Sequence, residues 1–309
     1  MLLADKLLEP EMMADSFVQM NDEMAEKIDT LMDDGVLGME DGLMDMLEAS
    51  GVNPLYFHCG TGNELIVCRE VQQAYREINT PEFRAKRRQW SWMYQCLVTF
   101  CMNYGVGPAS VFADLYNTHP QYSIDEEEVF SCLKAMGKET GKEYVRVNDL
   151  IVTRGLSKKK EWKKLQKAQG DIPFRQFTYD EIKDLGTFLY PYSHPDWAAL
   201  RNFLNNCEEI SIMTEEYMRT LTALVNSKLP PESYFNLLDS LLITLNNEET
   251  DKFAELCPKI LKSTPIVERR GNCDPDAVID RDAWNAAAEE YKNSNKATHL
   301  MAECDDLPF

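Results

Sequence analysis

The sequence predicts a mainly α fold, and three observations support this prediction. Apolar residues recur at helical spacing along most of the 309 residues. Segments rich in β-formers stand out at two places, near residues 55–68 and 144–153. The stretch 88–155 has the order helix, helix, helix, hairpin, which is the order of a winged helix. We therefore expect a central winged-helix-like unit with a small β-hairpin wing, a C-terminal helical domain and a short N-terminal hairpin.

Composition and charge divide the chain into three predicted regions. Residues 1–80 form an acidic, methionine-rich helical region with the short hairpin. Residues 81–170 form the winged-helix-like unit with a basic trailing helix, and residues 171–309 form a helical domain with a polar tail. The formal net charge of −20 favours solubility and repels nucleic acid at long range. Nine scattered cysteines and the lack of a basic N-terminal start predict a reduced, cytoplasmic protein without a signal peptide.

An amphipathic helix is predicted near the N-terminus. Its apolar stripe is formed by Phe17, Met20, Met24, Ile28 and Leu31, with acidic residues between them. Methionine-rich helices make adaptable contacts with partners, so this stripe is one candidate contact surface. The alternative is a helix that packs on its own domain.

The first helix of the central stretch is apolar on all sides. Trp90, Leu97 and Cys101 lie on one face, and Val98 and Phe100 fill another. Such a helix is buried in a core or spans a membrane. Residues 90–106 are too few, and too often polar, for the ~20 apolar residues of a span. We therefore expect a buried helix and no membrane partner.

The remaining parts of the central unit follow from capping and turn signals. Ser123 with Glu126 three residues later matches a capping box and predicts the start of the third helix. Two β-rich runs, Tyr144–Val147 and Leu150–Thr153, are separated by Asn148 and Asp149. This pair tolerates the left-handed backbone of a tight hairpin, so these runs form the predicted wing.

The acidic start of the third helix argues against DNA binding. A groove reader needs Lys and Arg beside the phosphates, whereas this helix begins with four carboxylates. They are the candidate partner-binding residues Asp125, Glu126, Glu127 and Glu128. An acidic surface of this kind binds a protein partner, or imitates nucleic acid in a partner's basic groove.

A basic segment after the wing supports the alternative function, which is binding of nucleic acid. Lysines can contact phosphates and a tryptophan can stack on a base. We favour the simpler interpretation, in which this segment is a solvated basic helix that pairs with the acidic ends of the same chain. The candidate residues are Arg154, Lys158, Lys159, Lys160, Trp162, Lys163, Lys164 and Lys167.

No catalytic, metal or cofactor pattern is recognisable. The four histidines fit no metal or nucleophile motif, and no Cys-x-x-Cys occurs. Thr178 with Glu181 is a helix-start signal in the C-terminal region. An enzyme site in that region is a distant alternative, because sequence alone cannot bring its polar residues together. Those residues are Tyr190, His194, Asp196, Arg269 and Arg270.

Three groups of segments, in this order, carry a resemblance to a known set of proteins. The first is VFADLYNTH, IDEEEVFSCL and YVRVNDLIV, the second FTYDEIKDLG and SHPDWAALRNFL, and the third STPIVERRGNCDPD. Together they resemble uncharacterised helical bacterial proteins that often end in a SEC-C zinc motif. The terminal cysteine cluster is absent here, and Val267 stands where those proteins have Trp. The resemblance implies a mostly helical intracellular fold of bacterial or phage type, without zinc and without an assigned activity.

The predicted function is therefore a non-enzymatic interaction or regulatory protein, of the inhibitor or adaptor kind. Its acidic N-terminal region and acidic third helix would contact a protein partner. The sequence leaves open the identity of that partner and whether the chain self-associates.

Overall fold

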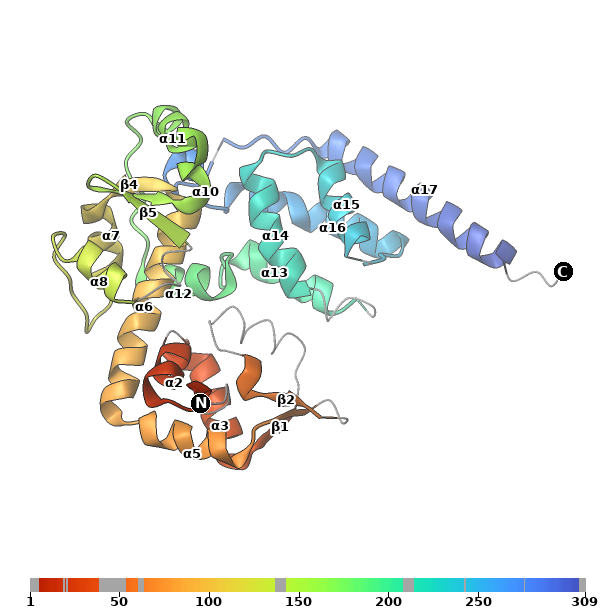
Figure 1. Ribbon diagram of the computed structural model, residues 1–309. Helices are drawn as coiled ribbons and strands as arrows, with labels where there is room; N and C mark the ends of the chain where they lie inside the picture. Colours follow the sequence, from red (N-terminus) through yellow and green to blue (C-terminus); the bar gives the residue numbers. More distant parts are fainter. Residues whose placement is uncertain are drawn as a thin grey trace. The chain divides into compact units, whose positions relative to one another are not determined.

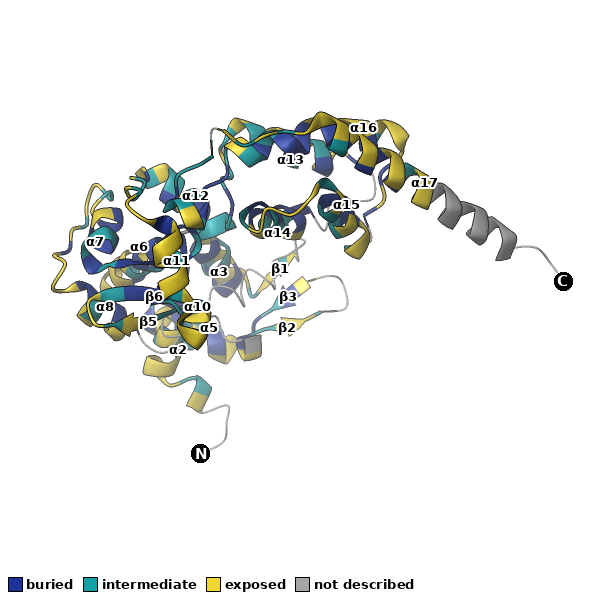
Figure 2. Cartoon of the chain, turned by 90° about the horizontal axis from the view of Figure 1, so that it is seen from above, coloured by how far each residue is buried: buried dark blue, intermediate teal, exposed yellow. Residues whose placement is uncertain are grey.

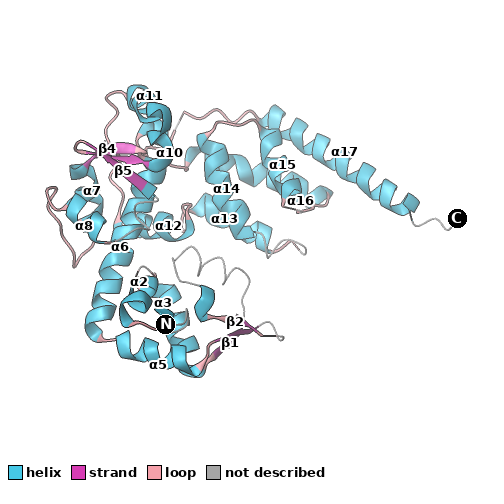
Figure 3. Ribbon diagram, in the orientation of Figure 1, coloured by secondary structure: helices cyan, strands magenta, loops and turns pink. Residues whose placement is uncertain are grey.

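The computed structural model describes residues 6–18, 20, 22–38, 54–60, 64–136, 143–207, 214–241, 243–274 and 276–305. Helices dominate these residues, and strands form two small three-stranded sheets (Figures 1 and 3). This confirms the mainly α fold. The chain divides into two compact units, which we describe separately. Unit 1 holds residues 1–98 and 108–154, and unit 2 holds residues 99–107 and 155–309.

The N-terminal part of unit 1 combines helices with a three-stranded sheet of order β1-β3-β2. β3 pairs antiparallel with β2, which is the predicted hairpin, and Cys59 lies opposite Leu65. Its connecting residues 61–63 lie outside the described part of the chain. β1 adds a third strand that the sequence did not predict. The elements are α2 (Pro10–Phe17), α3 (Asp22–Asp34), β1 (Val36–Gly38), η1 (Pro54–Tyr56), β2 (His58–Cys59), β3 (Glu64–Ile66) and α5 (Arg69–Ile78).

The predicted N-terminal stripe is the core of this part of unit 1. Phe17, Met20, Met24, Ile28 and Leu31 are all buried and belong to one cluster with residues of α5 and β3. This confirms the interpretation of a helix that packs on its own domain, and the stripe is not available as a contact surface for a partner. Its apolar area is already removed from water inside unit 1, which is the more favourable use of an amphipathic helix.

A polar network ties α3 and α5 to the long helix α6 (Pro81–Asn103). The Tyr75 hydroxyl donates to the Asp29 carboxylate at 2.8 Å, and the Asn79 amide donates to the same oxygen at 3.1 Å. The Arg87 guanidinium lies 3.9 Å from the other Asp29 oxygen, and its side chain is only 5% exposed. A buried charge of this kind is tolerated because it has an opposite charge and hydrogen-bond partners beside it.

Three helices and a hairpin form the rest of unit 1, in the predicted order. After α6 come α7 (Ala109–Tyr116), α8 (Val129–Ala135), β5 (Tyr144–Val147) and β6 (Leu150–Thr153). β5 and β6 are antiparallel with Val147 opposite Leu150, and Asn148 takes the left-handed φ of 56° that the turn requires. The sheet has the order β4-β6-β5, where β4 is Val106–Pro108, a strand that the sequence did not predict. The winged-helix assignment itself remains a prediction.

The third helix starts later than expected. Ser123 and Glu126 form no capping box, because residues 126–128 make a turn and α8 begins only at Val129. The Asp125 N–H instead donates to the Glu128 carboxylate at 3.4 Å. The four carboxylates therefore precede the helix and do not form its first turn.

Unit 2 is helical, and a single large apolar cluster holds its C-terminal helices together. Trp197, Tyr217, Phe253 and Trp284 are buried in this cluster, and α17 lies beside α15 and α16 (Figure 1). The elements are α10 (Arg154–Ser157), η2 (Lys158–Lys160), α11 (Glu161–Gln169), α12 (Tyr179–Phe188), α13 (Pro195–Asn205), α14 (Thr214–Asn226), α15 (Pro231–Ser240), α16 (Asn247–Leu256), η3 (Cys257–Lys262), η4 (Val267–Arg269) and α17 (Arg281–Asp305).

The predicted polar tail is helical for most of its length. The last helix, α17, continues through this tail to Asp305. Residues 292–305 contain neither glycine nor proline, so no residue there stops the helix.

Two loops of unit 2 that are about a hundred residues apart in sequence hold each other in place. The Gln169 amide donates to the carbonyls of Tyr104 and Val267, both at 2.7 Å. The Arg270 guanidinium donates to the Ile172 carbonyl at 2.7 Å, and the Asn272 amide to the Pro173 carbonyl at 2.8 Å. These contacts fix residues 169–177 against residues 263–274. In the part of the chain that the structure describes, no helix is long and apolar enough to cross a membrane.

Replacing Tyr75 with Phe tests the polar network of unit 1 through its pH dependence. Burial, followed by the nearby Asp29, raises the pKa of Tyr75 well above its ordinary value of 10.0. In alkali the unfolded chain therefore loses this proton first, so stability is full below about pH 10 and falls above it. Between about pH 10 and 11, the free energy of unfolding should fall by about 1 kcal/mol more in wild-type protein than in Tyr75→Phe. Urea unfolding measures this difference, and equal slopes for the two proteins would contradict it.

Replacing Gly271 with Ala tests the loop contacts of unit 2. Gly271 has a φ of 77°, and a Cβ there would lie 2.9 Å from a Tyr104 ring carbon and 3.0 Å from Phe177. We expect Gly271→Ala to lower the free energy of unfolding by about 2–4 kcal/mol. The matched control is Gly155→Ala, because a Cβ there meets nothing within 4 Å. Urea unfolding of both variants checks this, and equal effects would rule out the argument.

Candidate functional site

The four candidate carboxylates of unit 1 are on the surface. Asp125, Glu126, Glu127 and Glu128 are all exposed, on the turn between Ile124 and α8. Both ends of this turn are anchored, since Ile124 is 6% exposed and Val129 is fully buried. The structure therefore presents four adjacent negative charges on a short, fixed segment.

The basic segment is also exposed. Arg154 and all six lysines from 158 to 167 are exposed. Most of α11 faces water as well (Figure 2): only Gln169 at its end is buried, and Trp162 and Leu165 are half-buried. Lys159 and Lys160 both have a left-handed φ, of 55° and 58°, and mark the kink between η2 and α11. Trp162 is half-buried, and the Lys163 ammonium lies 5.4 Å from its ring centre. Among the described residues, no carboxylate forms an ion pair with the six lysines of this segment.

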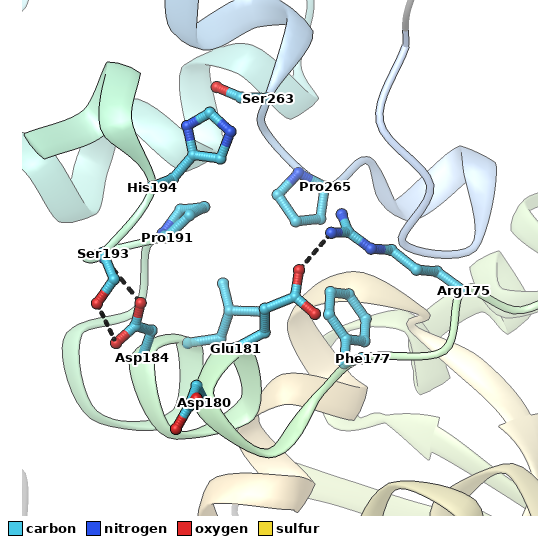
Figure 4. Close-up of a pocket in the computed structure, with 11 residues that line it drawn as sticks. Arg175, Phe177, Asp180, Glu181, Asp184, Pro191, Ser193, His194, Ser263 and Pro265 are labelled. Carbon is cyan, nitrogen blue, oxygen red and sulfur yellow. Dashed lines mark hydrogen bonds and ion pairs between the residues drawn. The ribbon is translucent and has the colours of Figure 1, made fainter.

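A pocket lies in unit 2, where α12, the loop before α13 and the segment after η3 meet (Figure 4). Its volume is about 200 Å³. Figure 4 shows His194 and Ser263 on one side of an open space, with Glu181 and Phe177 on the other. The eleven lining residues are Arg175, Phe177, Asp180, Glu181, Asp184, Leu185, Pro191, Ser193, His194, Ser263 and Pro265.

Glu181 is positioned by the start of α12. A complete capping box joins Thr178 and Glu181, as the sequence signal predicted. One Glu181 oxygen accepts from the Thr178 N–H at 2.9 Å, and the other accepts from the Arg175 guanidinium at 2.5 Å. The charge of this carboxylate is therefore neutralised inside unit 2.

Arg175 joins the pocket to the loop at residues 271–273. Its guanidinium also donates to the Gly271 carbonyl at 3.4 Å and to the Cys273 sulfur at 3.1 Å. Burial raises the pKa of the Cys273 thiol, and the positive charge of Arg175 opposes this rise. The thiol thus remains a protonated structural group at neutral pH.

Asp184 holds the loop that leads into α13. Its two carboxylate oxygens accept from the Ser193 N–H at 2.7 Å and from the Ser193 hydroxyl at 3.2 Å. Each oxygen keeps capacity for a further hydrogen bond. Asp184 is partly buried and Asp180 is exposed, and among the described residues neither forms an ion pair.

His194 acts as the N-cap of α13. Its Nδ1 accepts from the Asp196 N–H at 3.3 Å, so a neutral ring carries its proton on Nε2. A general base toward Ser263 would need Nε2 without a proton, as in a serine nucleophile site. The arrangement of His194 fits helix capping better than acyl transfer.

The structure brings together only some of the residues that the sequence singled out for the C-terminal region. His194 lies beside Asp196, at 3.9 Å, and is the one member of that set that lines the pocket. Tyr190 donates to Glu215, Arg269 pairs with Asp274, and Arg270 covers the Phe174 ring. Sequence reasoning missed Arg175 and Asp184, for which no local signal exists. For Glu181 the sequence showed a capping box, which predicts the start of a helix but does not indicate a pocket.

Within the described residues, no group of three or more His, Cys, Asp or Glu side chains could hold a metal ion. The eight cysteines from Cys59 to Cys273 are free thiols. No protein-family model, curated protein or solved structure matches the sequence.

Replacing Thr178 tests how the pocket wall is held. Thr178→Ala removes the hydroxyl that both accepts from the Glu181 N–H and donates to its carboxylate. We expect a loss of about 1 kcal/mol in the free energy of unfolding, because one orphan N–H of α12 loses its partner. Thr178→Ser keeps the hydroxyl, so its free energy of unfolding should lie within a few tenths of a kcal/mol, roughly, of the wild-type value. Urea unfolding distinguishes the two, and equal losses would show that the hydroxyl is not the cause.

Proposed function

We propose that this chain is a non-enzymatic interaction or regulatory protein, of the inhibitor or adaptor kind, that binds a basic protein partner. The observation that carries the proposal is the exposure of four consecutive carboxylates, residues 125–128, on one turn of unit 1. Charge complementarity steers such a surface toward a basic partner and raises the association rate.

Rigidity of the turn supports this proposal. The Asn117 side chain accepts from the Ile124 N–H at 2.7 Å and donates to the Ile124 carbonyl at 3.1 Å. The backbone at the start of the acidic turn is therefore fixed before any partner arrives. A pre-ordered surface loses less conformational entropy on binding than a mobile one.

Neutralising the acidic turn tests this proposal. The variant replaces Asp125 with Asn and Glu126, Glu127 and Glu128 with Gln. Affinity capture from the native host, followed by mass spectrometry, should recover a partner with wild-type protein. The purified partner should bind the variant at least about ten-fold more weakly, since each exposed ion pair contributes up to about 1 kcal/mol.

The matched control neutralises four exposed acids elsewhere in unit 1. These are Glu64, Glu70, Glu77 and Asp114. The control should bind like wild type, and the wild-type affinity should fall with added salt. Recovery of no stoichiometric partner, or equal weakening in both variants, would count against the acidic turn.

The exposure of the basic segment favours a second candidate function, binding of nucleic acid. Its lysines form no ion pair with described carboxylates, and Trp162, a residue type that can stack on a base, is only half-buried. The negative charge of the whole chain opposes this function at long range, which is why it ranks second.

Salt dependence decides this second function. Fluorescence anisotropy with labelled duplex DNA and single-stranded RNA should show binding at low salt that weakens steeply as salt rises. Lys159→Gln and Lys163→Gln should each flatten the slope of log K against log salt by about 0.9 for duplex DNA. The control is Lys134→Gln, a surface lysine of α8 outside the segment. Absence of binding at low salt would eliminate this function.

A further inference from the structure

We propose that the pocket of unit 2 binds an organic cation, namely an alkylammonium or alkylguanidinium group on a short aliphatic stem. This inference goes beyond the proposed function, and it does not depend on the acidic turn of unit 1. It rests on three properties of the cavity: its apolar walls, its excess of carboxylates, and its size.

The apolar walls suit a hydrocarbon stem. Phe177 and Leu185 are 3% and 2% exposed, and Pro265 is buried. Pro191 adds a further apolar ring to the lining. A stem of a few methylene groups would itself leave water when it lies against this wall, which favours binding by about 0.8 kcal/mol for each buried methylene.

The charges of the lining suit a positive head group. Three carboxylates and one guanidinium line the pocket. Arg175 is already committed to Glu181, the Gly271 carbonyl and the Cys273 sulfur. Among the residues that the structure describes, neither Asp180 nor Asp184 forms an ion pair, and the Asp184 oxygens keep unused acceptor positions. An anion would meet these two carboxylates, so the lining discriminates against it.

The volume limits the ligand to a small group. About 200 Å³ is below the ~300–1,000 Å³ of pockets for drug-sized ligands. A free aliphatic amine fits this limit, and so does one Lys or Arg side chain presented by a peptide. Both sources have the same chemistry, a cation on an aliphatic stem, and the experiment separates them.

Calorimetric titration of the full-length protein tests the inference, with pentylammonium and butylguanidinium chloride as probes. Both cations should bind, and 1-pentanol, which has a similar stem without charge, should bind at least about five-fold more weakly. A second arm compares the free cations with an acetylated Gly-Arg-Gly amide, which shows whether the pocket admits a side chain attached to a backbone.

Two variants locate the binding. Asp184→Asn removes the charge while its amide oxygen can still accept from Ser193, and Asp180→Asn changes an exposed side chain that forms no ion pair with another described residue. Each should weaken cation binding about five-fold and leave the affinity for 1-pentanol unchanged. Glu248→Gln, an exposed carboxylate of α16, is the matched control and should bind like wild type.

Three outcomes would overturn the inference: no cation binding at low millimolar concentration, equal affinity for pentanol and the cations, or unchanged binding in both aspartate variants. Asp180→Asn keeps the test valid if Asp184→Asn fails to fold. Because all these residues lie in unit 2, a negative result here leaves the partner-capture experiment on the acidic turn of unit 1 unaffected.

Discussion

The burial of the C-terminal part of α6 is the constraint on which the rest of the structure depends. From Ser91 to Asn103 this helix has no exposed residue, although polar side chains recur along it every four residues. Each buried polar group needs a hydrogen-bond partner, because losing water without one costs free energy. Gln95 donates to the Ser91 hydroxyl, Asn103 to the Thr99 carbonyl, and Thr99 to the Ile182 carbonyl at the start of α12.

The same constraint acts at the end of α6, where unit 2 begins its own core. Gly105 turns the chain with a φ of 70°, in a space already occupied by Leu165, Leu156 and Val267. The Tyr104 hydroxyl then donates to the Arg175 carbonyl at 2.5 Å. The buried C-terminal part of α6 and the turn that follows it thus help to place the segment that carries Arg175, which forms one wall of the pocket.

The charged groups of this protein fall into two physical classes. Arg87, Arg175 and Glu181 have partners within their own unit, so their charges stabilise the fold and are not available to a ligand. Residues 125–128 and the lysines of the basic segment are exposed instead. In water such groups contribute little to folding, and their charge is available for binding. The net charge of −20 does not show which charged residues are paired within the fold and which are exposed for binding.

The sequence by itself determined the features that depend on near neighbours. Periodic apolar residues located the helices, Asn148 located the hairpin turn, and the Thr178 and Glu181 pair located the start of α12. Tertiary structure alone decided the rest, including strands β1 and β4 and the burial of the N-terminal methionines. The pocket belongs to this second group, because Arg175, Asp184 and Ser263 come from three separate segments. The physical reason is that a capping bond or a turn involves residues a few positions apart, whereas burial and cavities arise from packing between segments that the chain order does not specify.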